Sequence, residues 1–256
     1  MIYFASDIHL GAGDNLQARR TERAFCRWLD HVAEDATAIY LMGDIFDFWF
    51  EYRGVVPKGF VRTLGRLAQL TERGIEVHLF IGNHDMWCGD YFERECGVRM
   101  HFCPEVVELC GKAIHLAHGD NMNISKQYAL RLMNSFFRSE TARWLFKWFI
   151  HPDMAMSFGA WWSGKSRKSH SKEHLTPDNL GFLIDYARGH HAKHPNVENY
   201  IFGHMHLPYD YRDEQLRVMF MSDWSGSSAS YIAMNEAGEA ELKTFESNET
   251  VSRTFR

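Results

Sequence analysis

Five clusters of polar side chains, each placed where a short apolar segment stops, constrain the fold of this 256-residue chain more than any other feature. The apolar segments stop after Phe4, Met42, Ile81, Ala117 and Phe202. In open α/β sheets, ligands bind in the crevice outside the carboxyl ends of the strands. The chain is therefore predicted to adopt an α/β fold in which the five clusters form one shared site.

The segments between the clusters alternate between strand and helix patterns. Strands are predicted at 2–6, 38–42, 76–81 and 199–202, a hairpin at 106–117, and helices at 16–32, 57–73 and near 89–95. Pro57 near the start and Gly74 just after the end mark the second of these helices. The last part is predicted to be β, at 217–221, 230–234 and 240–245, and a solvated helix end is predicted at His190, His191 and His194.

Composition excludes several classes of protein. Hydrophobic residues make up 45% of the chain, which is ample for a core, and a net charge of -5 excludes a uniformly basic nucleic-acid-binding protein. The five cysteines are odd in number and form no CxxC pair, which argues against a disulfide framework and for a reducing compartment. We expect a cytoplasmic protein, because the chain starts without a secretory signal and lacks an apolar run near the ~18 residues of a membrane span.

The polar clusters are rich in groups that bind divalent metal ions. They contain carboxylates, imidazoles and an amide but no thiolate: Asp7, His9, Asp44, Asn83, His84, His118, His204 and His206. Such a set suits Mn²⁺, Fe²⁺ or Zn²⁺ better than a soft metal. Two ions about 3.5–4 Å apart can clamp the attacking and leaving oxygens of a phosphoryl displacement. So many ligands around one shared carboxylate therefore predict a two-metal site for phosphate chemistry.

The clusters form five motifs in a fixed order along residues 1–206. They are Asp7-Ile8-His9, Gly43-Asp44-Ile45-Phe46-Asp47, Gly82-Asn83-His84-Asp85, His118-Gly119-Asp120 and Gly203-His204-Met205-His206. Each motif alone is a weak or moderate signal, but the ordered set resembles the calcineurin-like metallophosphoesterase family. The resemblance implies a four-layer αββα sandwich, a hydrolytic activity and two divalent metal ions, of which Mn²⁺ is the favoured identity.

The same resemblance implies a role for each site residue. The first ion is expected on Asp7, His9, Asp44 and His206, and the second on Asp44, Asn83, His118 and His204, so that Asp44 bridges them. His84 is expected to act as a general acid or as a donor to developing charge, with Asp85 orienting it. Asn83, His84, Asp120 and His204 are expected to face the substrate. Asp120 can instead support a ligand histidine, and Asp47 and Asp120 can also serve only as turn or capping residues.

Residues 121–172 interrupt the strand pattern and predict a helical insertion. Aromatic and aliphatic residues recur four positions apart, as in Trp144/Trp148 and Leu145/Phe149, and half of the eight tryptophans lie between 144 and 162. The insertion carries nine basic and two acidic residues on a chain whose net charge is -5. A basic, aromatic, amphipathic segment is typical of a membrane-surface element. The alternative is a helical cap whose aromatic side chains pack on the body of the protein.

An insertion at this point also resembles one branch of the family, which acts in lipid A biosynthesis. That branch hydrolyses the pyrophosphate bond of a UDP-linked diacylglucosamine and releases UMP and the acylated sugar 1-phosphate. The resemblance implies a core of residues 1–120 and 173–245, a lid of residues 121–172 and a flexible tail at 246–256. It also implies a nucleotide-linked glycolipid substrate and a peripheral position on the cytoplasmic face of the inner membrane. The expected lid contacts to the substrate are Ser163, Ser166, Arg167 and Lys168, whereas His84 departs from the branch, which carries Arg there.

Three alternatives remain at this stage. The chain can be another metal-dependent phosphoesterase that acts on a nucleotide or a nucleotide-linked lipid, or a non-enzymatic membrane-surface module. The non-enzymatic module is disfavoured because every expected metal ligand is intact. Nucleic-acid binding through the basic insertion is also disfavoured, because its basic residues alternate with apolar positions. Protein phosphatases carry Arg-Gly after the second motif, where this chain has Phe48-Trp49.

Overall fold

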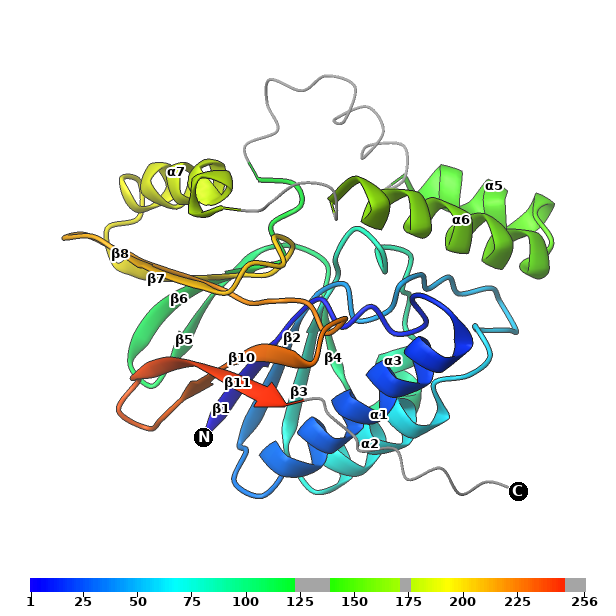
Figure 1. Ribbon diagram of the computed structural model, residues 1–256, viewed down its shortest axis with the longest axis horizontal. Coiled ribbons are helices and arrows are strands. Elements are labelled where there is room, and N and C mark those ends of the chain that lie inside the picture. Colours follow the sequence, from blue (N-terminus) through cyan, green and yellow to red (C-terminus); the bar gives the residue numbers. More distant parts are fainter. Residues whose placement is uncertain (123–138, 171–175, 247–256) are drawn as a thin grey trace.

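Two β-sheets packed face to face, with helices on both outer sides, form four layers in the computed structural model of the chain (Figure 1). The structure describes residues 1–122, 139–170 and 176–246. The six-stranded sheet has the order β11 (Ala240–Glu246), β10 (Ser228–Met234), β1 (Ile2–Ala5), β2 (Ala38–Met42), β3 (Glu76–Phe80) and β4 (Arg99–His101). The five-stranded sheet has the order β5 (Glu105–Leu109), β6 (Lys112–Ala117), β7 (Val197–Phe202), β9 (Arg217–Phe220) and β8 (Tyr209–Arg212). This arrangement confirms the predicted αββα fold class.

The helices cover the two sheets from outside. The six-stranded sheet is covered by α1 (Asn15–Val32), α2 (Val61–Glu72) and α3 (Tyr91–Cys96), and the five-stranded sheet by η2 (Pro177–Leu180) and α7 (Gly181–His191) (Figure 1). The start of α1 is fixed by Asp14, whose carboxylate accepts hydrogen bonds from the backbone N–H groups of Leu16 and Gln17. No helix in the described part of the chain is long and apolar enough to cross a membrane.

Side chains alternate between the two faces of each strand, and this divides the core into separate apolar layers. In β1, Tyr3 and Ala5 face the helices, whereas Ile2 and Phe4 face the second sheet. Each large apolar side chain that is fully buried, such as Phe4, contributes about 1.5–3 kcal/mol. Because both faces of the central strands are buried, their register is strongly specified and the loops at their carboxyl ends are held in place.

Parallel pairing brings the ends of the strands together. In the first sheet β1 pairs with β2 and β2 with β3 in parallel, and in the second sheet β6 pairs with β7 in parallel. Each of these five strands is followed by one of the five polar clusters. The predicted convergence of the clusters at one edge of the sandwich is therefore confirmed.

Some predicted boundaries are wrong, for local reasons. The helix predicted from residue 57 starts at Val61, because Gly59 and Phe60 have φ angles of 110° and 57° in the left-handed region. The short edge strands β4 and β8 were not predicted. The prediction that His190, His191 and His194 form a solvated helix end is also partly wrong. Nδ1 of His190 bonds to Tyr200 Oη, and Nδ1 of His191 bonds to the Val197 carbonyl.

The described part of the predicted insertion forms two helices, α5 (Glu140–Phe149) and α6 (Pro152–His170), joined by two residues. They lie beyond the loops that follow β2 and β3 (Figure 1). Phe146 of α5 packs against Phe50 and Trp87 from these loops, and Tyr52 Oη donates to the Ile150 carbonyl at 2.9 Å. Residues 123–138 and 171–175 of the predicted insertion, and 247–256 of the predicted tail, lie outside the described residues, and Glu246 belongs to β11.

Candidate metal centre and active site

Backbone strain is concentrated at the predicted metal ligands. Seven described residues other than glycine have a positive φ angle, and five of them are expected ligands: Asp7, His9, Asp44, His204 and His206. A left-handed conformation is uncommon for residues other than glycine, although Asp and His adopt it more readily than most, so five such residues at one site show that the surrounding structure favours it there. The strands end at the site, and the turns that follow them have the backbone conformation that points the candidate ligand side chains into it.

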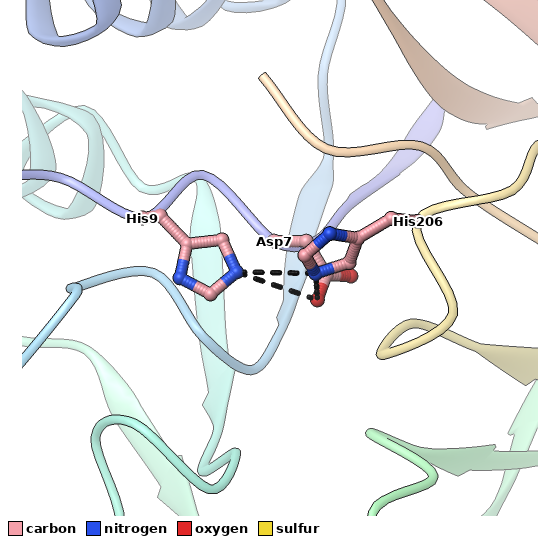
Figure 2. Close-up of side chains that lie close together, drawn as sticks. All are labelled: Asp7, His9 and His206. Carbon is pink, nitrogen blue, oxygen red and sulfur yellow. Dashed lines mark hydrogen bonds and ion pairs between the residues drawn. The ribbon is translucent and has the colours of Figure 1, made fainter. Parts of the chain in front are cut away.

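The first group of ligand atoms comes from the turn after β1 and the loop after β7 (Figure 2). Nε2 of His206 lies 3.2 Å from Asp7 Oδ1 and 3.2 Å from Nε2 of His9. Asp7 and His9 are buried, and His206 is partly buried. The Asp7 carboxylate also accepts the backbone N–H of His204 at 2.9 Å, which ties the two loops together.

A second group centres on Asp44, after β2. Nε2 of His118 lies 3.3 Å from Asp44 Oδ2, and His204 completes the group. His9 Nε2 lies 3.9 Å from the same Asp44 oxygen, so Asp44 lies between the two groups. Nδ1 of His118 donates to the Met42 carbonyl at 2.9 Å, which leaves Nε2 of the neutral ring as the nitrogen with a lone pair.

Mutual attraction dominates the electrostatics of this buried cluster. Burial alone would raise the pKa of the Asp7 carboxyl, but His206 lowers it to about 2. Burial would also raise the pKa of Asp44, but His118 holds it well below its usual range. The pKa of His118 is raised well above its usual value, because Asp44 outweighs the opposing effect of burial. The two carboxylates are thereby kept ionised, which is the state in which a carboxylate can bind a metal ion.

The residues present fit a divalent metal site. Asn83 Oδ1 is buried and has no hydrogen-bond partner among the described residues, although a buried amide oxygen is normally paired. Its neighbour Gly82 gives the Asp44 carboxylate the space it occupies, because a Cβ on Gly82 would lie 2.2 Å from Asp44 Oδ1. Carboxylate, imidazole and amide donors are the ligand types that divalent first-row metals accept.

Of the two expected catalytic residues, His84 faces the cluster and Asp85 faces the backbone. The ring Nε2 of His84 lies 4.0 Å from Asp44 Oδ2, and its backbone N–H donates to Asp44 Oδ1 at 2.8 Å. The Asp85 carboxylate accepts the backbone N–H groups of Gly82 and Ile45 at 2.7 and 2.8 Å. Asp85 therefore joins the turns after β2 and β3, and in the described structure its carboxylate bonds to backbone groups rather than to the His84 ring as expected.

Two acidic residues were missed or undervalued by sequence reasoning. Asp47 Oδ1 lies 3.6 Å from Nδ1 of His9 and 2.6 Å from Ser163 Oγ, so Asp47 is more than a turn residue. The signal in the sequence that could have indicated this role is the position of Asp47 in the second motif. Asp223 Oδ2 lies 3.9 Å from Nδ1 of His206. An isolated aspartate in the loop after β9 carries no sequence signal, because only the fold brings it to His206.

A mostly apolar cavity of about 70 Å³ opens beside these residues, between the strand-end loops and α6. Its lining includes Asp47, Phe48, Trp49, Asn83, His84, Met86, Trp87, Phe158, Trp162 and Ser163. Of the expected lid contacts, Ser163 is buried at this cavity, whereas the side chains of Ser166, Arg167 and Lys168 lie outside the described part of the structure.

Asp120 is half-buried and accepts a hydrogen bond from Asn121 Nδ2, and its charge helps to raise the pKa of His118.

Comparison with known proteins agrees with this geometry. Residues 1–208 match the sequence profile of the calcineurin-like phosphoesterases. A Porphyromonas gingivalis protein named UDP-2,3-diacylglucosamine hydrolase is 41% identical over 87% of this chain and 90% of its own length. Proteins of the same name from Pseudomonas aeruginosa and Haemophilus influenzae are 28% and 24% identical, over 87% and 93% of this chain and 90% and 96% of their own lengths. The chain therefore belongs to the calcineurin-like phosphoesterase family and is a metal-dependent hydrolase.

Proposed function

We propose that this protein hydrolyses the pyrophosphate bond of UDP-2,3-diacylglucosamine in lipid A biosynthesis, releasing UMP and 2,3-diacylglucosamine 1-phosphate. The observation that carries the proposal is the cavity in which aromatic side chains of α6 lie opposite Asn83 and His84. A substrate with a charged pyrophosphate and apolar acyl chains needs this combination of a metal-binding edge and an adjoining apolar wall. The names of the three relatives described above support the same substrate.

The proposed site holds two divalent ions, with Mn²⁺ as the favoured identity. Asp7, His9, Asp44 and His206 would hold one, and Asp44, Asn83, His118 and His204 the other. Such a pair supplies Lewis-acid stabilisation of phosphoryl charge and lowers the pKa of a bound water. The bond from His118 Nδ1 to the Met42 carbonyl keeps Nε2 directed at Asp44, so the ligands are preorganised before the substrate arrives.

The remaining side chains of the site would bind and orient the substrate. His84 would donate a proton or a hydrogen bond to the phosphoryl oxygens, and Asn83, Asp120 and His204 would border the same space. Phe158 and Trp162 would face an acyl chain and keep water away from the reacting phosphate. Ser166, Arg167 and Lys168 remain proposed contacts for the polar part of the substrate. In this proposal residues 1–120 and 173–245 form the core, and residues 121–172 form the lid.

We also propose that the lid places the enzyme on the cytoplasmic face of the inner membrane. Large side chains of α5 and α6 are exposed: Trp144, Leu145, Trp148, Phe149, Met154, Phe158, Trp161 and Trp162. Trp148 and Phe149 reach 67% and 76% exposure, which is unusual for a soluble surface. An aromatic surface on a basic segment is suited to the interface of an anionic membrane, where the lipid substrate resides.

The decisive experiment is a product assay. Purified protein with Mn²⁺ is expected to release UMP from UDP-2,3-diacylglucosamine, and Asp44→Ala is expected to abolish this release by removing the proposed bridge. Asp30→Asn is the control, because Asp30 lies on the exposed face of α1 and pairs only with Arg66 in the described structure. Cleavage of an aryl phosphodiester without any release of UMP would overturn the proposed substrate. It would favour a different nucleotide or nucleotide-linked lipid, an alternative suggested by His84 in place of Arg.

A further inference from the structure

Ser163 of α6 makes a contact between the insertion and the candidate active site that the proposed function does not use. Its side chain is only 1% exposed, although it lies on a helix whose neighbouring aromatic residues are exposed. Its Oγ lies 2.6 Å from Asp47 Oδ1 and 2.8 Å from Nδ1 of His84. A serine within a helix commonly bonds to the carbonyl four residues earlier, whereas this one bonds to residues 116 and 79 positions away.

The chemistry of the partners determines the direction of each hydrogen bond. The Asp47 carbonyl, 2.9 Å from Nδ1 of His84, can only accept, so Nδ1 carries the proton. The same Nδ1–H is shared with the Ser163 hydroxyl, which accepts from it and donates its own hydrogen to the Asp47 carboxylate. In the neutral ring this leaves Nε2 unprotonated on the side of Asp44, whose Oδ2 is 4.0 Å away, so Nε2 is the nitrogen that must take up a proton before His84 can donate one to a phosphoryl oxygen.

Packing of α6 holds Ser163 at this position. One turn earlier, Gly159 lies so close to the Phe48 ring that an added Cβ would be 2.2 Å from Phe48 Cδ1. Ser163 and Gly159 are four residues apart and therefore on the same face of the helix. Phe48 follows Asp47 directly, so the helix packs on the same loop that supplies both acceptors for the hydrogen bonds of Ser163 and His84.

We propose that Ser163 is a positioning residue that connects Asp47 to His84 and, together with the Asp47 carbonyl, holds the imidazole as the Nδ1–H tautomer with Nε2 directed at the metal-binding edge. The orientation of His84 is then complete only when α6 is seated on the core. The proposal rests on the proposed function in one respect: His84 must act in the hydrolytic reaction. In this proposal the Ser163 hydroxyl positions His84 instead of contacting the substrate directly.

The kinetic test compares Ser163→Ala, Ser163→Thr and His84→Ala with the combination of Ser163→Ala and His84→Ala. Each is assayed with UDP-2,3-diacylglucosamine and with bis(p-nitrophenyl) phosphate, which has no acyl chain. Ser163→Ala is expected to lower kcat about 10-fold on both substrates with KM within about twofold, as for other residues that orient an active-site group. Ser163→Thr keeps the hydroxyl and is expected to restore most of kcat. Adding Ser163→Ala to His84→Ala is expected to have no further effect.

Two kinetic results would overturn the proposal. A higher KM for the lipid substrate with unchanged kcat would show that Ser163 contacts the substrate directly. A full additional loss in the His84→Ala background would show that Ser163 does not act through His84. If the wild-type protein cleaves only the aryl diester, the proposed substrate fails, but these comparisons still decide the role of Ser163.

A second readout does not require activity. In metal-free protein labelled with ¹⁵N-histidine, the ring signals of His84 are assigned by their loss in His84→Ala. The wild-type ring is expected as the Nδ1–H tautomer, and Ser163→Ala is expected to shift it toward a mixture while Ser163→Thr preserves it. An Nε2–H tautomer in the wild-type protein, or an unchanged ring in Ser163→Ala, would refute the proposal whatever the enzyme hydrolyses.

Discussion

Single residues in the candidate site join one loop to another. Asp7 accepts the backbone N–H of His204, and Asp85 accepts the backbone N–H groups of Gly82 and Ile45. These bonds join separate turns to one another, and so they hold the ligand geometry in place. Sequence reasoning singled out the candidate ligands by type and order, but it missed the cross-links because they join residues far apart in the chain.

Gly82 provides a test at this scale. In Gly82→Ala the new methyl group would lie 2.2 Å from Asp44 Oδ1 and 2.7 Å from the Asp44 backbone nitrogen. Because Gly82 does not have a left-handed φ, the effect is due to this contact rather than to backbone strain. We expect a loss of more than about 100-fold in activity and a lower bound-metal content, measured by steady-state kinetics and elemental analysis.

The matched control is Gly65→Ala, at a glycine of α2 with no atom within 4 Å of an added Cβ. It is expected to keep full activity and to raise the free energy of unfolding by about 0.5–1 kcal/mol, as alanine does in a helix interior. Normal metal content in Gly82→Ala would contradict the assignment of Asp44 as the central ligand.

At the scale of elements, long apolar or periodic segments of the sequence predicted helices and strands better than short ones did. The boundaries predicted for the strand at 38–42 agree with β2, because a continuous apolar run ends in Gly43-Asp44. The strands β4 and β8 have three and four residues, too few for a period to be read from the sequence. Pro57 suggested a helix start four residues too early, since left-handed backbone at Gly59 and Phe60 delays the helix.

The contact between β6 and α7 makes the stability of the protein depend on pH. His115 of β6 is buried against Tyr186 of α7, whose hydroxyl lies 3.2 Å from Nε2 of His115. Burial, with a smaller contribution from His190, lowers the pKa of His115 to about 4. The unfolded chain, in which the imidazole has a pKa of about 6.5, therefore binds the proton more tightly than the folded chain.

It follows that the free energy of unfolding falls as the pH is lowered from about 6.5 to about 4, by at most about 3 kcal/mol from this group. The variant His115→Phe removes the titrating ring and is expected to show a shallower slope in this window. Urea titrations of the metal-free wild type and variant at several pH values measure the difference. Parallel slopes would exclude His115 as a source of the pH dependence.

At the scale of the whole molecule, the candidate metal centre joins the two sheets. Asp7 and Asp44 follow strands of the six-stranded sheet, whereas His118, His204 and His206 follow strands of the five-stranded sheet. A metal ion bound by both sets would connect layers that the apolar core between them and the bond from His204 N–H to Asp7 also hold together. Metal binding and folding would therefore be coupled, because the unfolded chain does not hold these groups together.

Metal removal is accordingly expected to destabilise the whole fold. A free Mn²⁺ concentration of 100 times its Kd should raise the free energy of unfolding by about 2.7 kcal/mol over protein treated with a chelator. Differential scanning calorimetry at several Mn²⁺ concentrations measures this effect as a rising Tm. Asp44→Ala is expected to lose most of the rise, and an equal rise in that variant would place the stabilising ion elsewhere.

The amino-acid sequence by itself determined the α/β class, the order of the polar clusters and the types of ligand available. These are properties of short segments, because a strand pattern and the polar residues after it lie within about ten positions of each other. The tertiary structure alone decided that Asp85 bonds to backbone, that Asp223 approaches His206, and that Ser163 lies between Asp47 and His84. These contacts join residues from separate elements, and only the packing of sheets and helices brings such residues within hydrogen-bonding or ion-pair distance.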